Sequence, residues 1–383
     1  MNKGSKRQIR VLHVVGGMNR GGAETWLMHV LRHIDRDRFR FDFLVHTDKP
    51  CAYDDEIRDL GSKIIPCLVP SQPWRYAVNF TRILKEYGPY DAVHSHVHHY
   101  SGFVLWLAER AGIPIRISHS HSDTSQYDSK AGIIRKVYLR ITERLVGQYA
   151  TNGVACSDKA AAALFGPEWK KNGRQRILYC GVDLRPFSET VVSAQVRREL
   201  GIPIDAYVVG HVGRFSEVKN HVFLLDIVRC MVEHDPNVRC LLVGDGPLRQ
   251  EIEEKVNQLG LKDKVIFTGL RSDVPRLMMG AMNVFLLPSL NEGLPLVSIE
   301  AQAAGLPCVF SEVIPEEADA VGSLVHRVAL NLPAQKWVDV IIDVKNETIS
   351  SKKQPLDVIS QSSFNIIKSV AQLEKIYAVY AEK

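Results

Sequence analysis

The chain has 383 residues, of which 45% are hydrophobic and 24% charged, and its formal net charge is +5. This length exceeds one ordinary hydrophobic core and fits two α/β domains. No apolar run approaches the roughly 18 residues that a membrane-spanning helix needs, which excludes an integral membrane protein. The modest positive charge comes without a nucleic-acid-binding motif, so we expect no nucleic-acid partner.

The N-terminus and the cysteines indicate the cellular compartment. Residues 1–10 are polar and basic and lack the apolar region of a signal peptide. The seven cysteines form no Cys-x-x-Cys pair, and an odd, scattered set fits reduced thiols. We therefore expect a cytoplasmic protein without structural zinc.

Apolar runs alternate with segments of helical periodicity along the chain. The first series predicts strands at 9–15, 41–46, 91–96, 113–119 and 151–156, with helices such as 23–34 and 101–111 between them. The second series predicts strands at 207–212, 238–243, 265–267, 283–288 and 308–310, with helices at about 220–234, 247–259 and 296–304. This alternation predicts two doubly wound, Rossmann-like α/β domains that face each other across a ligand-binding cleft.

The boundary between the domains is predicted in a polar segment that contains Pro186, with the linker near 184–190. This gives an N-terminal domain of residues 1–185 and a C-terminal domain of residues 186–363. The Ser-, Lys- and Gln-rich stretch 346–363 predicts surface loops. A last helix at about 364–381 carries an apolar stripe that another part of the chain must cover.

A helix predicted over 130–148 combines cations with apolar side chains. The cations are Lys130, Arg135, Lys136, Arg140 and Arg144, and the apolar residues are Ile133, Ile134, Val137, Leu139, Ile141 and Leu145. We interpret the charges as the solvated face of a packed helix. A helix that lies on a membrane surface is the alternative.

The first predicted strand leads into a glycine-rich loop with Gly16, Gly17, Gly21 and Gly22. Glycines let the backbone turn tightly and approach a ligand, and the amides at the following helix start can bind an anion. The loop matches neither a P-loop nor the Gly-x-Gly-x-x-Gly fingerprint. A turn without a ligand is the alternative.

Charged residues follow two predicted strands of the second domain. Arg214 and Lys219 come after strand 207–212, and a guanidinium beside an ammonium suits a diphosphate, although two surface cations are the alternative. Glu292 and Glu300 flank a Gly-x-Pro turn at a helix start, where backbone amides can bind phosphate and Glu300 can accept hydrogen bonds from vicinal hydroxyls. A capping role is the alternative for Glu292.

Together with Val-Gly-Asp-Gly-Pro at 243–247 and the turn at 267–269, these motifs resemble glycosyltransferase family 4 over nearly the whole chain. The His-Ser-His segment at 119–121 and the tail at 311–317 are similar to bacterial exopolysaccharide and capsule transferases of the EpsF-like kind. The resemblance implies a GT-B fold and a retaining, metal-independent transferase. Its substrates would be a nucleotide-sugar donor, which we expect to be a UDP-sugar, and a glycan or lipid-linked acceptor in polysaccharide biosynthesis. It implies no cofactor, and peripheral contact with the cytoplasmic face of the membrane is compatible with it.

The resemblance also assigns roles by matching position. Arg214 and Lys219 would hold the donor diphosphate, Glu300 the ribose hydroxyls, and Glu292 the donor sugar. The other positions assigned to the donor side of the site are Gly16, Gly17, Gly21, Gly22, Gly244, Gly269, Leu270, Gly293, Leu294 and Leu296. The family places a catalytic histidine at the end of an N-domain strand, and we favour His119 over His121. By the same resemblance, residues 364–383 would pack back on the first domain.

Two departures and two other functions qualify this interpretation. Cys180 stands where family members carry Asn, and residues 313–315 replace a Gly-Gly loop. A GT-B nucleotide-sugar epimerase and a catalytically silent nucleotide-sugar-binding subunit are the alternative functions. We interpret His94, His96, His98 and His99 as structural and expect no metal site, because no carboxylate ligand accompanies them.

Overall fold

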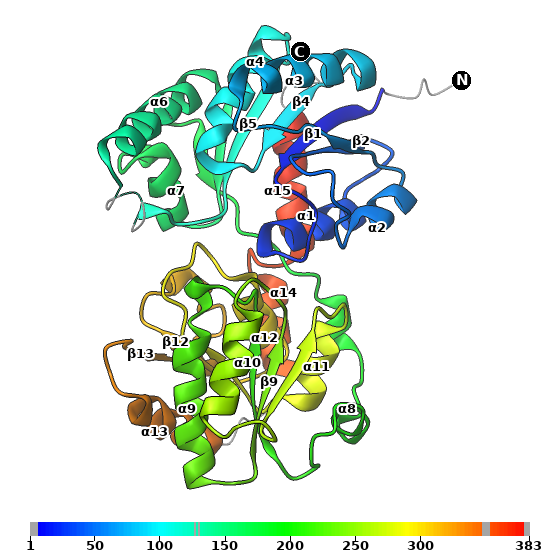
Figure 1. The fold of residues 1–383 in the computed structure, drawn as a ribbon. Coiled ribbons are helices and arrows are strands. Elements are labelled where there is room, and N and C mark those ends of the chain that lie inside the picture. The colour runs from blue at the N-terminus through cyan, green and yellow to red at the C-terminus, as the bar shows by residue number, and fades with distance from the viewer. Residues whose placement is uncertain (1–6, 126–127, 129–130, 347–352, 379–383) are drawn as a thin grey trace, which may run out of the picture. The chain divides into compact units, whose positions relative to one another are not determined.

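The structure is a computed structural model that describes residues 7–125, 128, 131–346 and 353–378 (Figure 1). The chain divides into two compact units. Unit 1 comprises Met1–Gly181 and Ile366–Lys383, and unit 2 comprises Val182–Asn365. The sequence had suggested boundaries after 185 and after 363, so the chain changes unit a few residues away from both positions.

Unit 1 contains a seven-stranded parallel sheet in the order β3-β2-β1-β4-β5-β6-β7. Its strands are β1 (Ile9–Val15), β2 (Phe39–Val45), β3 (Ile64–Pro66), β4 (Ala92–Ser95), β5 (Ile115–Ser120), β6 (Asn152–Ala155) and β7 (Gln175–Ile177). The order reverses direction between β1 and β4. In an open α/β sheet, such a reversal creates a crevice beyond the carboxyl ends of the two strands, where ligands bind.

Helices cover the sheet of unit 1 on both faces (Figure 1). They are α1 (Gly22–His33), α2 (Asp54–Asp59), α3 (Pro73–Tyr87), α4 (Ser101–Arg110), α6 (Ile133–Tyr149), α7 (Asp158–Phe165) and α15 (Ile366–Ala378), with 3-10 turns η1 (His98–Tyr100) and η2 (Trp169–Lys171). Proline begins α3, where its missing amide hydrogen costs nothing. The Ser157 hydroxyl caps α7 by accepting from the amide of Ala160.

The C-terminal helix α15 packs beside α1 in unit 1 (Figure 1). The indole nitrogen of Trp26 donates to the Ser369 hydroxyl over 3.3 Å, and both residues are buried. Leu373 and Tyr377 are also fully buried on this helix. Of its predicted apolar stripe, Val370, Leu373, Ile376 and Tyr377 are therefore buried in unit 1. Ile367 is 58% exposed, Phe364 belongs to unit 2, and Tyr380 lies outside the described residues.

Unit 2 contains a six-stranded parallel sheet in the order β10-β9-β8-β11-β12-β13. Its strands are β8 (Tyr207–Val212), β9 (Val238–Val243), β10 (Val265–Gly269), β11 (Val284–Leu287), β12 (Cys308–Ser311) and β13 (Val325–Val328). Its helices are α8 (Ser193–Glu199), α9 (His221–His234), α10 (Arg249–Gln258), α11 (Val274–Ala281), α12 (Leu296–Ala303), α13 (Ala334–Asn346) and α14 (Lys353–Gln361), with 3-10 turns η3 (Arg185–Ser188), η4 (Glu217–Lys219), η5 (Glu316–Ala318) and η6 (Gly322–Leu324). Here the strand order reverses between β8 and β11.

The prediction of surface loops over 346–363 was wrong for residues 353–361, which form α14. This helix packs on α12, and Ile359 is fully buried. The polar composition of the segment hid its one apolar face. The short strands β3, β7 and β13 were also not predicted, because three or four residues carry too little periodicity to show a strand.

Two further features bear on the class of protein. Among the described helices, none has both the length and the apolar character needed to cross a bilayer. All seven cysteines are free.

Candidate functional site

The strand reversal in unit 2 brings together the loops that follow β8 and β11. The amide of Leu290 donates to the carbonyl of Val218 over 2.8 Å, and the Asn220 side chain donates to the carbonyl of Pro288 over 3.1 Å. Asn220 has a left-handed backbone with φ of 55°, a conformation that asparagine tolerates better than most residues. These bonds fix one loop against the other at the carboxyl edge of the sheet.

The charged residues predicted from the sequence meet at this point. The Lys219 ammonium lies 2.6 Å from the Glu292 carboxylate, and the two side chains are only 16% and 13% exposed. Arg214, on the same loop as Lys219, is exposed, and its side chain makes no hydrogen bond or ion pair within the part of the chain that the structure describes. The site thus offers one oriented ammonium and one open guanidinium to an anionic ligand.

Gly244 brings a third loop against the loop after β8. Its φ is +139°, and a Cβ there would lie 2.0 Å from the carbonyl oxygen of Gly213. The amide of Gly213 donates to the carbonyl of Val243, and the amide of Phe215 donates to the carbonyl of Asp245, both over 3.0 Å. Only glycine permits this backbone approach.

The loop after β10 joins the same edge. The Gly244 amide donates to the carbonyl of Gly269 over 2.9 Å, and Leu270, the next residue, is half exposed. The carboxyl ends of β8, β9 and β10 are therefore linked through backbone contacts. They form a continuous rim that includes Gly244, Gly269 and Leu270.

Helix α12 begins directly after the charged loop. Leu294 and Leu296 are buried, as is the backbone around Gly293, so the turn is held firmly at the start of the helix. Glu300 follows in the second turn and is not fully enclosed, yet burial around its carboxyl raises its pKa to about 7. This carboxyl group therefore changes its charge close to neutral pH.

In unit 1, the predicted glycine loop joins β1 to α1 at the strand reversal. A Cβ at Gly17 would lie 3.0 Å from the Thr47 methyl group and 3.2 Å from the Cys51 sulfur, so this position is tight. At Gly16 and Gly22 a Cβ would meet nothing within 4 Å. Gly21 precedes α1 as its N-cap, with an extended backbone. Packing thus explains the glycine at Gly17 but not those at Gly16 and Gly22.

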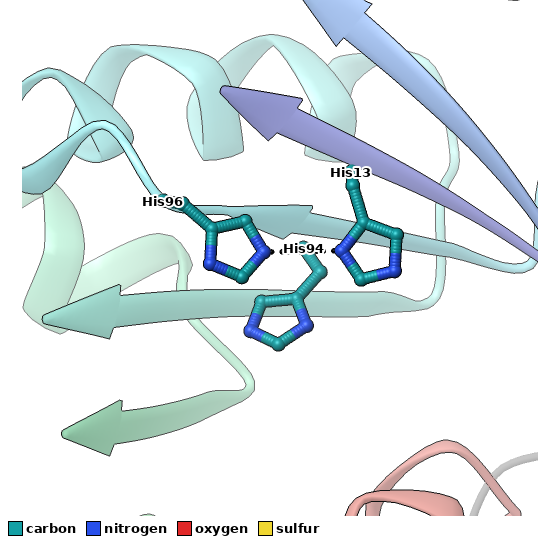
Figure 2. Close-up of side chains that lie close together, drawn as sticks. All are labelled: His13, His94 and His96. Atoms are coloured by element: carbon teal, nitrogen blue, oxygen red, sulfur yellow. Dashed lines mark hydrogen bonds between the residues drawn. The ribbon is translucent and has the colours of Figure 1, made fainter. Parts of the chain in front are cut away.

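A cluster of histidines lies in the same unit. His13 of β1 is paired in register with His94 of β4, so both side chains leave the same face of the sheet. His96 follows the end of β4. Figure 2 shows the His13 and His96 rings directed toward each other, with the His94 ring beside them; the His13 Nδ1 and His96 Nε2 atoms lie 3.0 Å apart.

His119 and His121 extend this cluster from β5. The strand continues through Ser120, so His119 lies inside the strand, fully buried, whereas His121 comes directly after it and is partly exposed. His119 Nδ1 lies 3.2 Å from His94 Nε2, and His121 Nε2 lies 2.9 Å from His96 Nδ1. The strand ends at Ser120, one residue beyond the predicted end at 119, so His119 and His121 stand on either side of that end.

The sheet-facing sides of α1 and α15 cover the cluster. The Tyr377 hydroxyl lies 2.7 Å from His94 Nδ1, and the Trp26 ring packs edge-on to His119 with 5.0 Å between centroids. The Cys180 sulfur lies 3.9 Å from His121 Nδ1. Two hydrogen-bonded series result, one running from His13 to Cys180 and one from Tyr377 to His119.

Burial determines the charge of these imidazoles. Burial lowers the pKa of His13 and of His121 to about 3, and the neighbouring His98 contributes to the lowering at His121. It also lowers the pKa of His94, His96 and His119 well below the usual range. The cluster is therefore neutral at neutral pH, and His121 can offer a hydrogen bond but not a formal positive charge.

Among the described residues, the ring nitrogens of these histidines lie close enough together to hold a metal ion. His13, His94 and His96 form one triple and His96, His119 and His121 another, each with nitrogen atoms within 4.8 Å of one another. Neutral imidazoles bind zinc and copper. In both triples, however, nitrogens are already engaged in imidazole–imidazole hydrogen bonds, and His96 uses both of its own.

His98 and His99 lie outside this cluster, in η1. His98 Nε2 faces the carbonyl of Ser122, and His99 Nε2 faces the carboxylate of Asp128, each at 3.3 Å. No role was predicted for His13 or Trp26, and Tyr377 was predicted only as part of the apolar stripe of the last helix. The available signal for His13 was that it and His94 occupy matching places in two predicted strands, 9–15 and 91–96. The contact of Tyr377 joins residues 283 positions apart and left no local signal.

Comparison with known proteins adds to this geometry. Residues 21–179 match the family described as glycosyl transferase 4-like domain, and residues 192–355 match glycosyl transferases group 1. A protein of Bacillus subtilis (strain 168) named as the glycosyltransferase EpsF is 37% identical over 379 residues, which cover 98% of each chain. The chain belongs to the family 4 glycosyltransferases.

Other relatives of this glycosyltransferase are more distant. The UDP-Gal:alpha-D-GlcNAc-diphosphoundecaprenol alpha-1,3-galactosyltransferase of Escherichia coli is 23% identical, with 98% of both chains covered. The crystal structure of Anabaena HepE in complex with UDP and glucose superposes with a TM-score of 0.81 at 20% identity, covering 97% of this chain and 100% of the other. The two parallel, doubly wound sheets are thus those of the GT-B fold.

Proposed function

We propose that this glycosyltransferase transfers a sugar from a UDP-sugar to a lipid-linked glycan acceptor in polysaccharide biosynthesis, with retention of configuration at the anomeric carbon. The donor and acceptor classes are supported by the names of relatives. The E. coli relative uses UDP-Gal and a diphosphoundecaprenol-linked acceptor, and HepE was crystallised with UDP.

The observation that carries the proposal is the charge arrangement at the strand reversal of unit 2. Lys219, oriented by Glu292 at 2.6 Å, and the open Arg214 lie on one loop at the carboxyl edge of the sheet. A diphosphate that enters there would gain charge-assisted hydrogen bonds from both cations. Because negative charge grows on the diphosphate as the sugar leaves, the same contacts strengthen in the transition state and accelerate the transfer.

The remaining donor contacts follow from the same rim. Glu300 would bind the ribose hydroxyls, and the backbone around Gly244, Gly269 and Leu270 would border the base. The amides at the start of α12 would bind the distal phosphate. Glu292 would sit near the donor sugar, where its second carboxylate oxygen can accept from a sugar hydroxyl while the first holds Lys219.

The transfer would need no metal ion. Arg214, Lys219 and the helix-start amides supply the positive charge that a divalent ion supplies in other transferases. Glu292, the carboxylate at the centre of the proposed site, is already bound to Lys219 and is a poor candidate for a metal ligand.

In unit 1, we assign the acceptor-side role to His121 in preference to His119. A fully buried imidazole such as His119 cannot touch a substrate without a rearrangement, whereas His121 is partly exposed. His121 is neutral because its pKa is about 3, so it would position the acceptor or the donor sugar by hydrogen bonding. His96, which bonds to His121 Nε2, is a positioning residue for that ring.

The experiment combines the purified protein with UDP-glucose, UDP-galactose or UDP-N-acetylglucosamine and a diphosphoundecaprenol-linked sugar, and mass spectrometry identifies the products. A product heavier by one sugar is expected, and nuclear magnetic resonance of its new anomeric centre should show the donor's configuration. An altered sugar nucleotide without any acceptor would instead identify an epimerase. Tight UDP binding without turnover on any acceptor would identify a silent binding subunit.

A further inference from the structure

Helix α6 exposes large apolar side chains to solvent. Ile133 is 75% exposed and Ile134 85%, and Val137, Tyr138 and Ile141 are between 40% and 53% exposed. Figure 1 shows α6 beside α4 and α7, which it contacts within unit 1. Single exposed apolar residues are common on proteins, but five on one helix form a patch that needs an explanation.

These five residues share one side of the helix. At about 100° per residue they fall within an arc of about 140°. Thr142 and Val146, the two fully buried residues of α6, lie outside this arc. The interpretation of α6 as a packed helix with only its charges in solvent was therefore wrong for Ile133, Ile134, Val137 and Ile141.

Close packing fixes the helix in this orientation. A Cβ at Gly102 of α4 would lie 2.7 Å from the Thr142 carbonyl oxygen and 2.9 Å from the Leu145 Cβ. The missing side chain at Gly102 thus lets the two helices approach closely along the face that contains Thr142 and Val146. The apolar arc cannot turn inward without breaking this contact.

Cations border the exposed apolar residues. Lys136, Arg140 and Arg144 are exposed and make no ion pair with any described residue, whereas Arg135 is bound by Asp128. Glu143 is the only acidic residue within α6. At the helical period, Lys136 and Arg140 lie beside one edge of the apolar arc, and Arg144 lies just inside that edge.

We propose that α6 docks on the surface of a bilayer that contains anionic lipids, with its isoleucines inserted among the lipid chains and its cations against the headgroup phosphates. An amphipathic helix with an aliphatic face and flanking Lys and Arg is suited to the membrane interface. A second copy of the chain fits less well, because pairing of two α6 faces would bring the same unpaired cations together.

A protein held on the membrane surface would meet a lipid-linked acceptor there. The docking surface rests on the proposed function only for this biological role. Binding to vesicles requires neither donor nor turnover. The test of the surface can therefore fail or succeed independently of the test of glycosyl transfer.

The experiment measures co-sedimentation of the full chain with vesicles of equal parts phosphatidylglycerol and phosphatidylethanolamine, and with vesicles of phosphatidylcholine alone. We expect binding to the anionic vesicles that weakens as salt is added. Ile133→Ser combined with Ile134→Ser should weaken binding at least about tenfold. Arg140→Gln combined with Arg144→Gln should weaken it about 25-fold, from about fivefold for each charge near the surface.

Ile204→Ser serves as the matched control, because Ile204 is 55% exposed in unit 2 and should bind vesicles like the wild type. Thermal unfolding and transfer to an acceptor in detergent should be unchanged in all variants, since none of these residues belongs to the proposed site. Absence of binding by the wild type, or equal binding by the α6 variants, would overturn the proposal. So would a wild-type dimer in light scattering that the isoleucine variant converts to a monomer while vesicle binding persists.

Discussion

The buried histidines of unit 1 predict a steep loss of stability in mild acid. His13, His94 and His119 are fully buried, and burial lowers the pKa of each below the value near 6.5 of an unfolded chain, for His13 to about 3. Below pH 6.5 the unfolded chain therefore binds protons that the folded chain excludes. The stabilising contribution is complete above pH 6.5 and is lost as the pH falls toward the folded-state pKa.

The magnitude follows from proton linkage. Each histidine that is protonated only in the unfolded chain changes the free energy of unfolding by about 1.4 kcal/mol per pH unit. Between pH 7 and pH 5 this amounts to about 2 kcal/mol for His13, whose folded-state pKa is about 3. His94 and His119 contribute in the same direction. A typical domain has a free energy of unfolding of about 5–15 kcal/mol, so the titration of His13 alone should remove a substantial part of the stability of unit 1 near pH 5.

Urea unfolding followed by circular dichroism at a series of pH values tests this reasoning, with His13→Gln as the main variant. Glutamine keeps a hydrogen-bonding group toward His96 but cannot titrate, so the slope of stability against pH should fall by about 1.4 kcal/mol per pH unit. His234→Gln is the control, because His234 is exposed at the end of α9, and its slope should match the wild type. Equal slopes for the wild type and His13→Gln would refute the claim that His13 stays neutral in the fold.

Four further predictions concern the proposed site. Because ionised Glu300 would accept hydrogen bonds from the ribose and its pKa is about 7, UDP should bind more weakly at pH 6 than at pH 8. Calorimetry of Glu300→Gln should show a smaller dependence than the wild type, and what remains belongs to the terminal phosphate of UDP. Lys219→Met should lower the free energy of unfolding by about 1–3 kcal/mol, because it leaves the Glu292 carboxylate without its partner, and adding Glu292→Gln should restore part of it; no recovery would argue against the pair. His121→Ala should reduce kcat at least about tenfold with little change in the KM for donor, whereas a larger loss of kcat in His119→Ala at unchanged stability would reverse the assignment. EDTA should leave turnover intact, and loss of activity that magnesium or manganese restores would contradict the charge roles of Arg214 and Lys219.

The sequence was most informative where a motif is local. The loops with Arg214, Lys219 and Glu292 each follow a strongly apolar strand, and the chain order alone predicts two parallel sheets. Because parallel sheets bring the carboxyl ends of their strands to one edge, the assembly of these loops could be anticipated. Lys219 and Glu292 are 73 positions apart, and their loops could be expected to meet at one edge of the sheet. The sequence could not predict that the two side chains form an ion pair at 2.6 Å.

The sequence was least informative where the structure depends on a single residue or on a contact between distant parts of the chain. The end of β5 at Ser120 determines which of His119 and His121 is buried, and strand ends are not specified by periodicity to one residue. The closure of the histidine cluster by Tyr377 depends on the packing of α15. On α6, periodicity could show an apolar arc but not that its side chains stay exposed.

The most direct test of the account is a calorimetric titration of UDP into the full chain and into Arg214→Ala and Lys219→Ala variants. The control is Lys336→Ala, because Lys336 is an exposed cation of unit 2 whose partner is Asp339. We expect the wild type and the control to bind UDP alike and each site variant to bind at least about tenfold more weakly, because a charge-assisted hydrogen bond is lost. Absence of UDP binding by the wild type, or equal affinity in all four proteins, would contradict the assignment of the donor diphosphate to this loop.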